Sequence, residues 1–324
     1  MTEPLGPPAK LSVRDARLSY PGRGSRPVPA VDGVSFEVAA GETLGIVGES
    51  GCGKSSLAKL IVRLARGGEG EVRLDGDRID DRGTAAWKAL RRRLQYVFQD
   101  PLGALDPRMP VLAQVREPLD IHRIGTPATR RRRASDVLDA VGIGPHLFDS
   151  APSGLSGGQR QRVVLARALV LEPDVLLCDE PVSALDVSVQ AQVLGLLSGL
   201  RERLGLTMLF ISHDLAVVRH VSDRVAVLYL GRIVELGEVD PVFTRPAHPY
   251  TVALLDAVPR LDGRADRIRL AGETPSAAAR PAGCAFAARC PAAQDRCRGS
   301  DPELVQLADG RRVACHFPYV LEVR

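Results

Sequence analysis

The stretch that most constrains the fold of this chain lies near its N-terminus. It fits the pattern G-x-x-x-x-G-K-[ST], in which glycines let backbone N–H groups converge on a phosphate group. The apolar run 43–47 before it predicts a buried strand, and the spacing of apolar residues in 57–64 predicts a helix. A helix N-terminus attracts anions, so phosphate groups are expected to bind there. In this pattern we expect Lys54 to contact the β- and γ-phosphates of a nucleotide and Ser55 to ligate Mg²⁺. The stretch reads Gly48-Glu49-Ser50-Gly51-Cys52-Gly53-Lys54-Ser55-Ser56.

The overall composition limits the classes of protein to consider. At 324 residues the chain has room for one large domain and a smaller one, and its apolar runs are too short to span a membrane. The N-terminus lacks the basic and apolar segments of a secretion signal, so we expect no secretion. A net charge of +4 is too small to indicate a nucleic-acid partner. Six cysteines in a chain that is not secreted argue against disulfides.

Strand and helix patterns alternate along most of the chain, which predicts an α/β fold with a parallel sheet. Residues 101–154 differ, because prolines and helical spacing dominate there, and this indicates a helical insertion. Turn residues predict hairpins at Asp75-Gly76 and around Gly231, and prolines bound a short helix within 241–259. The other expected strands are 11–20, 31–38, 95–98, 175–178 and 207–211, and the other expected helices are 87–94, 159–170 and 187–200.

Two adjacent carboxylates follow the expected strand 175–178, namely Asp179 and Glu180. Ligands bind at the carboxyl ends of strands in open α/β sheets, so both side chains are expected at the ligand edge. We interpret Asp179 as a partner of Mg²⁺ and Glu180 as the base that orients and deprotonates an attacking water. The alternative is a helix-capping aspartate followed by a surface glutamate.

A second candidate anion site is Leu155-Ser156-Gly157-Gly158-Gln159, which opens an expected helix. Ser156 is a suitable N-cap, and the two glycines leave backbone N–H groups accessible to an anion. Taken alone, the pattern also fits a plain helix start. It becomes informative through its order in the chain, after the phosphate loop and before Asp179-Glu180.

This order of motifs resembles that of the nucleotide-binding subunits of ABC transporters over residues 11–245. The pattern 155–159 matches the signature motif of that family without deviation, and 175–180 matches its Walker B strand. Taken alone, Tyr20 at the end of the expected strand 11–20 also fits a core position. The remaining matches are Tyr20 to the aromatic residue that stacks on adenine, Gln99 to the Q-loop, Ser183-Ala184-Leu185-Asp186 to the D-loop and His213 to the switch histidine.

The resemblance implies a P-loop NTPase fold, a RecA-like ABC nucleotide-binding domain at 1–245 with a helical subdomain at about 101–168, and a small cysteine-rich domain at 246–324. It implies ATP and Mg²⁺ as cofactors. The implied catalytic residues are Glu180, His213 and Gln99, and the implied magnesium ligands are Ser55, Gln99 and Asp179. The implied nucleotide contacts are Tyr20, Gly48, Glu49, Ser50, Gly51, Cys52, Gly53, Lys54, Ser55, Ser56, Ser156, Gly157, Gly158, Gln159 and Asp186.

The resemblance also implies partners. In such subunits the signature of one chain covers the γ-phosphate held by the phosphate loop of another, so that two ATP molecules lie in a head-to-tail dimer. This chain has one phosphate loop and one signature, and therefore needs a second nucleotide-binding chain or a copy of itself. The permease must be a separate chain.

Finer details are similar to the oligopeptide and dipeptide importer ATPases. This similarity lies in the motif sequences themselves, in His248-Pro249-Tyr250-Thr251 and in the cysteine-rich tail. In addition, Pro181-Val182-Ser183 resembles the second ATPase of the importer pair. The similarity implies a heterodimer of ATPases, two transmembrane permease subunits, an extracellular substrate-binding protein and a place at the cytoplasmic face of a bacterial membrane. Residues 151–154 depart from the family's usual Tyr-Pro-His-Gln.

Other functions fit the sequence less well. The same motor could serve nickel, glutathione or another solute, which the ATPase does not touch. A soluble ABC ATPase of DNA repair or translation would carry a long coiled coil or a second nucleotide-binding domain, whereas only 99 residues separate Ser55 from Leu155 and they lack heptads. A non-hydrolysing subunit is disfavoured by the presence of both Glu180 and His213.

Four cysteines gather in the C-terminal tail with 5, 6 and 17 residues between them. Zinc sites usually contain a close C-x₂₋₄-C pair, which is absent here, and four thiolates on a loop-rich segment also suit an iron–sulfur cluster. Cys52 and Cys178 lie inside motifs and are expected to be inert. The family resemblance favours a [4Fe–4S] cluster, and zinc or unmetallated thiols remain open for Cys284, Cys290, Cys297 and Cys315.

Overall fold

The structure is a computed structural model that describes residues 9–22, 27–79, 85–257 and 280–319. These residues form two units, each described by itself. The phosphate-loop unit contains the described residues of 9–38, 42–78 and 210–319. The helical unit contains the described residues of 39–41 and 79–209.

An antiparallel sheet of four strands forms the N-terminal part of the phosphate-loop unit. Its order is β2-β1-β4-β5. Asp75 and Gly76 join the last two strands with φ angles of 49° and 84°, the positive values of a type I′ turn, which confirms the hairpin predicted there. The strands are β1 (Ala9–Tyr20), β2 (Val28–Ala39), β4 (Glu69–Leu74) and β5 (Asp77–Arg78).

A second set of strands in this unit has the order β3-β9-β10-β12-β11. β3 runs parallel to β9, and β10 pairs antiparallel with β9 and with β12. The predicted hairpin around Gly231 is confirmed, and it turns through Leu230 (φ 43°) and Gly231 (φ 80°). The bounds are β3 (Thr43–Val47), β9 (Arg224–Tyr229), β10 (Arg232–Glu238), β11 (Val305–Gln306) and β12 (Arg312–Val313).

The single short helix expected within 241–259 is a pair of helices instead. The first ends at Thr244, and the second begins at Pro249 after His248, whose Nδ1 accepts a hydrogen bond from the Tyr250 N–H at 3.0 Å. Proline suits a first helical position because its fixed φ matches the helix and it has no N–H to satisfy. Residues 258 and 259 lie outside the described residues. The helices of this unit are α1 (Lys54–Ile61), α8 (Leu215–Val221), α9 (Val239–Thr244), α10 (Pro249–Asp256) and α11 (Asp295–Gly299).

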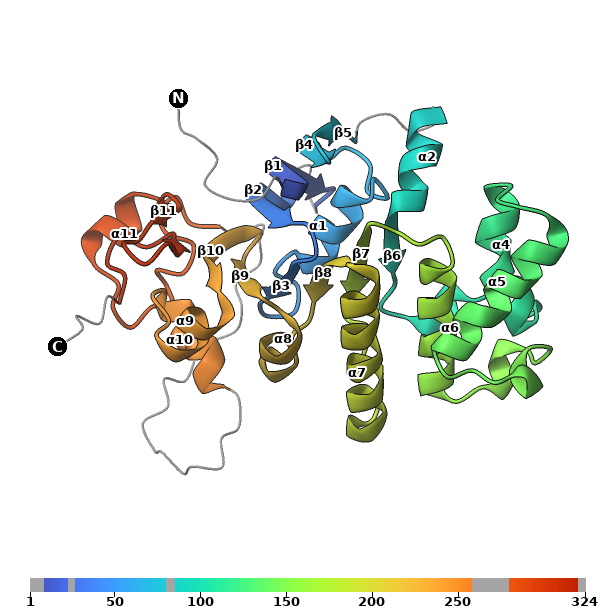
Figure 1. Ribbon diagram of the computed structural model, residues 1–324. Helices are drawn as coiled ribbons and strands as arrows, with labels where there is room; N and C mark the ends of the chain where they lie inside the picture. The colour runs from blue at the N-terminus through green and yellow to red at the C-terminus, as the bar shows by residue number, and fades with distance from the viewer. Residues whose placement is uncertain (1–8, 23–26, 80–84, 258–279, 320–324) are drawn as a thin grey trace. The chain divides into compact units, whose positions relative to one another are not determined.

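The helical unit contains the insertion that the sequence predicts. Within 101–154 the structure has helices and no strand, and α4, α5 and α6 pack side by side (Figure 1). β6 and β7 pair in parallel, and β8 follows β7 in the sheet and continues into the other unit after Leu209. The elements are α2 (Ala85–Arg93), β6 (Leu94–Val97), α3 (Pro101–Ala104), α4 (Val111–Ile121), α5 (Pro127–Ala140), two 3₁₀ turns (Pro145–Leu147 and Pro152–Gly154), α6 (Gly157–Leu169), β7 (Val175–Asp179), α7 (Val187–Leu204) and β8 (Thr207–Ile211).

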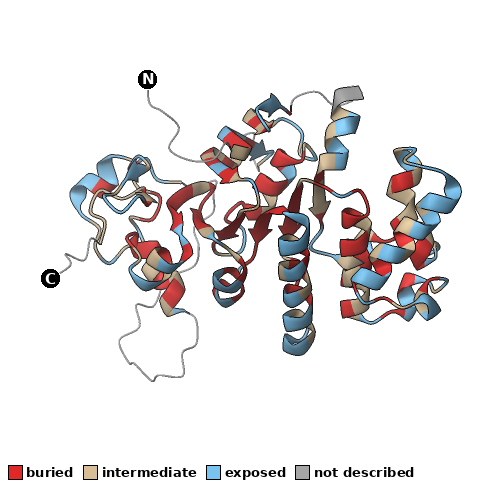
Figure 2. Ribbon diagram, in the orientation of Figure 1, coloured by how far each residue is buried: buried red, intermediate tan, exposed pale blue. Residues whose placement is uncertain are grey.

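Three strands are buried along their whole length, as Figure 2 shows for β3, β7 and β8. Continuous apolar runs of this kind are typical of parallel strands covered on both faces. Each strand leads directly into a predicted site: β3 into the phosphate loop, β7 into Glu180 and β8 into His213. The fold therefore holds the candidate residues at the ends of rigid strands.

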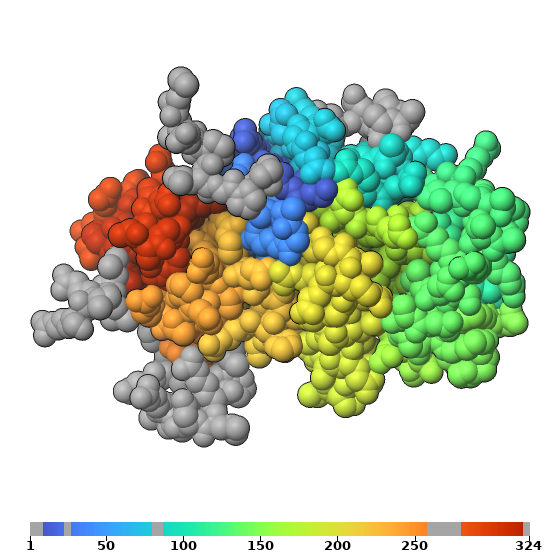
Figure 3. All heavy atoms as spheres, viewed as in Figure 1, coloured from blue at the N-terminus to red at the C-terminus, as the bar shows by residue number. Residues whose placement is uncertain are grey.

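The C-terminal residues do not stand apart from the phosphate loop. Residues 280–319 belong to the phosphate-loop unit, and the Ala314 N–H donates to the Val234 carbonyl at 2.8 Å. Figure 3 shows them in red against the orange residues that precede position 257. A separate cysteine-rich domain is thus not supported, and the boundary at 245 stays a prediction. No helix in the described ranges is long and apolar enough to cross a membrane.

Candidate functional site

The phosphate loop connects β3 to α1 in a conformation that requires glycine. Gly53 has a φ of 106°, and a Cβ atom there would lie 2.0 Å from the Ala30 carbonyl oxygen. Gly53 is the N-cap residue of α1 and makes no side-chain cap. Glycine at the N-cap has no side chain to occupy the end of the helix, and the helix dipole places partial positive charge there. This arrangement fits an anionic ligand such as the phosphates of ATP.

Lys54 brings the full positive charge to this loop. Its side chain is buried, and its ammonium donates to the carbonyls of Gly48 at 2.8 Å and Glu49 at 3.0 Å. A buried ammonium needs such partners because burial without them costs several kcal/mol. The carbonyls of the loop thus hold the charge that the sequence assigns to phosphate binding.

Asp179 ends strand β7 and Glu180 follows it, and each has a partner from the segment that begins at β6. The Tyr96 hydroxyl donates to Asp179 at 2.7 Å, and the Gln99 amide donates to Glu180 at 3.0 Å. The structure therefore brings predicted residues Gln99 and Glu180 together. The alternative of a helix cap is not supported for Asp179, whose carboxylate is buried and bonded to Tyr96.

Glu180 has a backbone φ of 48°, which lies in the left-handed region that residues other than glycine rarely adopt. Such conformations cost on the order of 1–3 kcal/mol and occur often at functional sites. This backbone conformation occurs at the residue that directly follows strand β7.

Tyr96 is a site residue that the sequence analysis missed. Burial and the hydrogen bond to Asp179 raise the pKa of Tyr96, so its hydroxyl stays protonated and remains a donor. Tyr96 is 83 residues from Asp179 and meets it because β6 and β7 pair with Tyr96 opposite Leu177. No local pattern marks a contact that depends on strand register.

The predicted N-cap at the signature motif is confirmed. Ser156 accepts a hydrogen bond from the Gln159 N–H at 3.2 Å, and the Gln159 side chain accepts one from the Ser156 N–H at 2.9 Å. These two bonds form a capping box. Gly158 has an additional packing role, because a Cβ atom there would lie 2.3 Å from the Val189 side chain of α7.

Three other predicted residues lie at element ends. Tyr20 ends β1 and is 41% exposed, so it is not the core residue that was the alternative. Asp186 caps α7 by accepting from the Val189 N–H at 3.0 Å and the Ser188 hydroxyl at 2.8 Å, and these bonds lower the pKa of Asp186. His213 is exposed and directly precedes Asp214, the N-cap of α8.

The four tail cysteines line one small pocket, together with His248 and Phe286. All six cysteines of the chain are free thiols, and Cys52 and Cys178 are buried as expected of inert residues. Nevertheless, in the part of the chain that the structure describes, no group of three or more His, Cys, Asp or Glu residues is arranged to hold a metal ion. Neither the predicted [4Fe–4S] cluster nor a zinc site at Cys284, Cys290, Cys297 and Cys315 is therefore supported.

The phosphate loop, the signature helix and the Walker B strand together define an ATP-binding cassette. Comparisons agree with this class. Residues 31–183 match the family model described as ABC transporter, and residues 234–297 match that of the oligopeptide/dipeptide transporter C-terminal region. A solved dimer of an ATP-binding cassette bound to ADP and Pi is 30% identical, covers 71% of this chain and 98% of its own, and has a TM-score of 0.64.

Curated relatives identify the family. A protein of Brucella abortus (strain 2308), named a peptide import ATP-binding protein, is 51% identical over 94% of this chain and 92% of its own. A protein of Bacillus subtilis (strain 168), named an oligopeptide transport ATP-binding protein, is 45% identical over 95% of each chain. The chain therefore belongs to the ATP-binding proteins of the ABC transporter family, and its enzymatic activity is ATP hydrolysis.

Proposed function

We propose that this chain is the ATP-hydrolysing subunit of a peptide importer. The observation that carries the proposal is the match of residues 234–297 to the oligopeptide/dipeptide transporter C-terminal region, on a chain with a complete phosphate loop. The names of the relatives support it. Nickel, glutathione or another solute in place of peptide would be an outcome of the transport measurement.

Within the phosphate-loop unit, Lys54 and the N-terminus of α1 would hold the β- and γ-phosphates, and the exposed ring of Tyr20 would stack on adenine. The Ser55 hydroxyl is a proposed ligand of Mg²⁺, which would neutralise phosphate charge. The other proposed contacts are the loop residues Gly48 to Ser56 and the switch residue His213.

Within the helical unit, Glu180 is proposed as the base that takes a proton from the attacking water, and Gln99 holds its carboxylate in place. Asp179 and Gln99 are the proposed magnesium ligands of this unit. The signature residues Ser156 to Gln159, together with Asp186, would contact the nucleotide of a second ATPase chain.

That second chain leads to a testable expectation. A solved relative is dimeric, and the present chain has one phosphate loop and one signature motif. Purified alone, it should be monomeric and nearly inactive, whereas co-expression with a related ATPase and two permeases should restore hydrolysis at the cytoplasmic face of the membrane. Turnover by the isolated chain as fast as that of the complex would rule out the need for a partner. An extracellular binding protein would deliver the peptide.

A second proposal concerns the four cysteines of the tail, which we propose bind a [4Fe–4S] cluster. The family resemblance motivates it, and the four cysteines line one pocket, although the described residues are not arranged to hold a metal ion, so that binding requires the thiols to move. Burial is the main cause of a raised pKa at Cys284, Cys290 and Cys315, and neighbouring cysteines contribute to it; the pKa of Cys315 is raised to about 11. Without a cation these thiols are protonated near neutral pH, so a bound metal centre would have to displace their protons. When bound, the cluster would supply a cross-link between distant residues.

Metal content tests this proposal directly. Protein purified without oxygen should be brown and contain about four irons per chain, and Cys297→Ser should lose them. Cys178→Ser is the matched control, since Cys178 is buried in β7, and it should keep the iron. One zinc and no iron per chain, or neither metal in anaerobic protein, would contradict the cluster.

A further inference from the structure

Glu49, a residue of the phosphate loop, makes hydrogen bonds through its carbonyl, its N–H and its carboxylate. Its carbonyl accepts from Lys54 at 3.0 Å, and its N–H donates to the Tyr250 hydroxyl at 2.9 Å. Its carboxylate receives both terminal nitrogens of Arg289, at 2.7 and 2.8 Å. Two of its partners, Tyr250 and Arg289, lie 201 and 240 residues further along the chain. The C-terminal part of the protein therefore contacts the phosphate loop directly.

These contacts are largely shielded from solvent. The Arg289 side chain is 6% exposed and that of Glu49 is 20% exposed. Paired N–H···O bonds between guanidinium and carboxylate fix orientation as well as charge, and they are stronger away from water. Around them, the Tyr250 ring packs on Tyr229 at 4.5 Å between centroids and on Phe286 at 5.4 Å.

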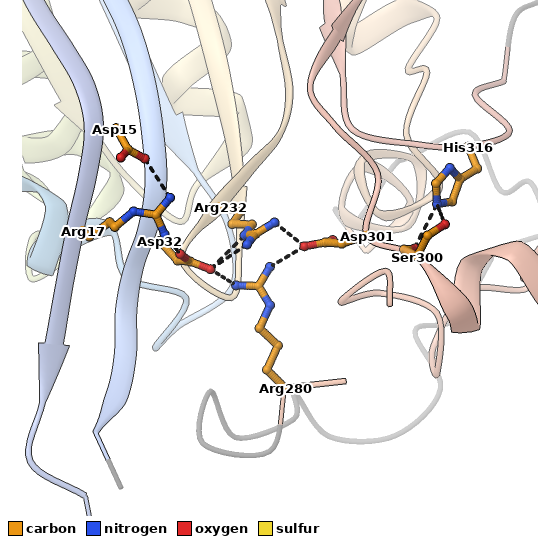
Figure 4. A network of polar contacts seen from close by, with 8 residues as sticks. All are labelled: Asp15, Arg17, Asp32, Arg232, Arg280, Ser300, Asp301 and His316. Carbon is orange, nitrogen blue, oxygen red and sulfur yellow. Dashed lines mark hydrogen bonds and ion pairs between the residues drawn. The ribbon is translucent and has the colours of Figure 1, made fainter. Parts of the chain in front are cut away.

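A second position of the loop, Cys52, is connected to the C-terminal part of the chain through Gly231 and its neighbour. The Gly231 N–H donates to the Cys52 carbonyl at 2.8 Å. The next residue, Arg232, pairs with Asp32 at 2.9 Å and with Asp301 (Figure 4). Arg280 also contacts both aspartates, so two charged connections link residues 280–301 to the segments around the loop.

We propose that Arg289 is a positioning residue for ATP binding, through which the C-terminal part of the chain sets the affinity of the phosphate loop. The proposal rests on the proposed nucleotide binding. Arg289 neutralises a carboxylate that lies within the phosphate loop, and it fixes the residue whose carbonyl holds Lys54. Without Arg289, the Glu49 carboxylate would repel the phosphates and the loop would lose its paired contact with the C-terminal part of the chain.

Binding of Mg-ATP to the full chain, measured by calorimetry beside the thermal unfolding temperature, tests this inference. Arg289→Ala should weaken ATP binding about tenfold, equivalent to about 1.4 kcal/mol. Because the unpaired carboxylate causes most of the loss, adding Glu49→Gln to Arg289→Ala should restore part of the affinity. Arg289→Lys keeps the charge without the paired geometry and should be intermediate.

Arg298→Ala is the matched control, since Arg298 belongs to the same segment and pairs with Asp295 at 3.1 Å on the surface. It should bind ATP like the wild type. The inference is overturned if Arg289→Ala binds ATP within about twofold of wild type, or if Arg298→Ala weakens binding equally. If Arg289→Ala does not fold, wild-type affinity of Arg289→Lys overturns it. Failure of the wild-type chain to bind ATP would instead contradict the proposed function.

Discussion

Replacing Glu180 with glutamine should reduce ATP turnover by the assembled transporter about 10²–10⁴-fold, because an amide cannot take the proton of the attacking water. ATP binding should persist, since Lys54 and the start of α1 are unchanged. Glutamine also keeps the size of the side chain and can still accept the hydrogen bond that Gln99 donates at 3.0 Å. A loss of ATP turnover in Glu180→Gln would therefore result from the loss of a basic group and not from disruption of the site.

Glu202→Gln provides the comparison for this variant. Glu202 lies exposed on α7, so the same chemical change there should leave turnover within about twofold of wild type. Near-normal turnover by Glu180→Gln in the assembled complex would show that another group acts as the base.

Lys54→Ala should abolish measurable ATP binding, with affinity reduced by at least about 10²-fold, or about 2.7 kcal/mol. The substitution removes a buried charge whose ammonium lies 2.8 Å from the Gly48 carbonyl within the loop. It also leaves the carbonyls of Gly48 and Glu49 without this donor, so the loop itself should become less ordered. Equilibrium binding of Mg-ATP to the purified chain measures the effect.

Lys59→Ala serves as the control for Lys54→Ala, because Lys59 lies exposed on the same helix, one and a half turns further on. It removes the same charge from the same element and should bind ATP like wild type. Equal losses in the two variants would mean that net charge, and not the loop geometry, determines binding.

Local patterns predicted the parts of the site that depend on residues near one another in sequence. The phosphate loop, the Ser156 cap and the hairpin at Asp75-Gly76 need only a few neighbouring residues with particular backbone angles or capping groups. The buried strands before Gly48 and Asp179 are continuous apolar runs, which are equally local signals. Such features were predictable from the chain alone.

Contacts between distant residues were not predictable in this way. Tyr96 meets Asp179 through the register of two parallel strands, and Arg289 meets Glu49 across 240 positions of sequence. Arginine is also abundant in this chain, so no feature distinguishes Arg289 from its neighbours before the fold brings it to the loop. The split of the expected 241–259 helix likewise depends on His248, which is buried against Phe286.

The function proposed for this chain is peptide import that is driven by its ATP hydrolysis. Its most direct test is uptake of a labelled peptide into vesicles that contain the assembled transporter, with ATP on the side of this subunit and the binding protein on the other. Uptake is expected to require ATP and to be lost in Glu180→Gln. Peptide uptake that persists in Glu180→Gln, or ATP-driven uptake of another solute with none of peptide, would contradict it.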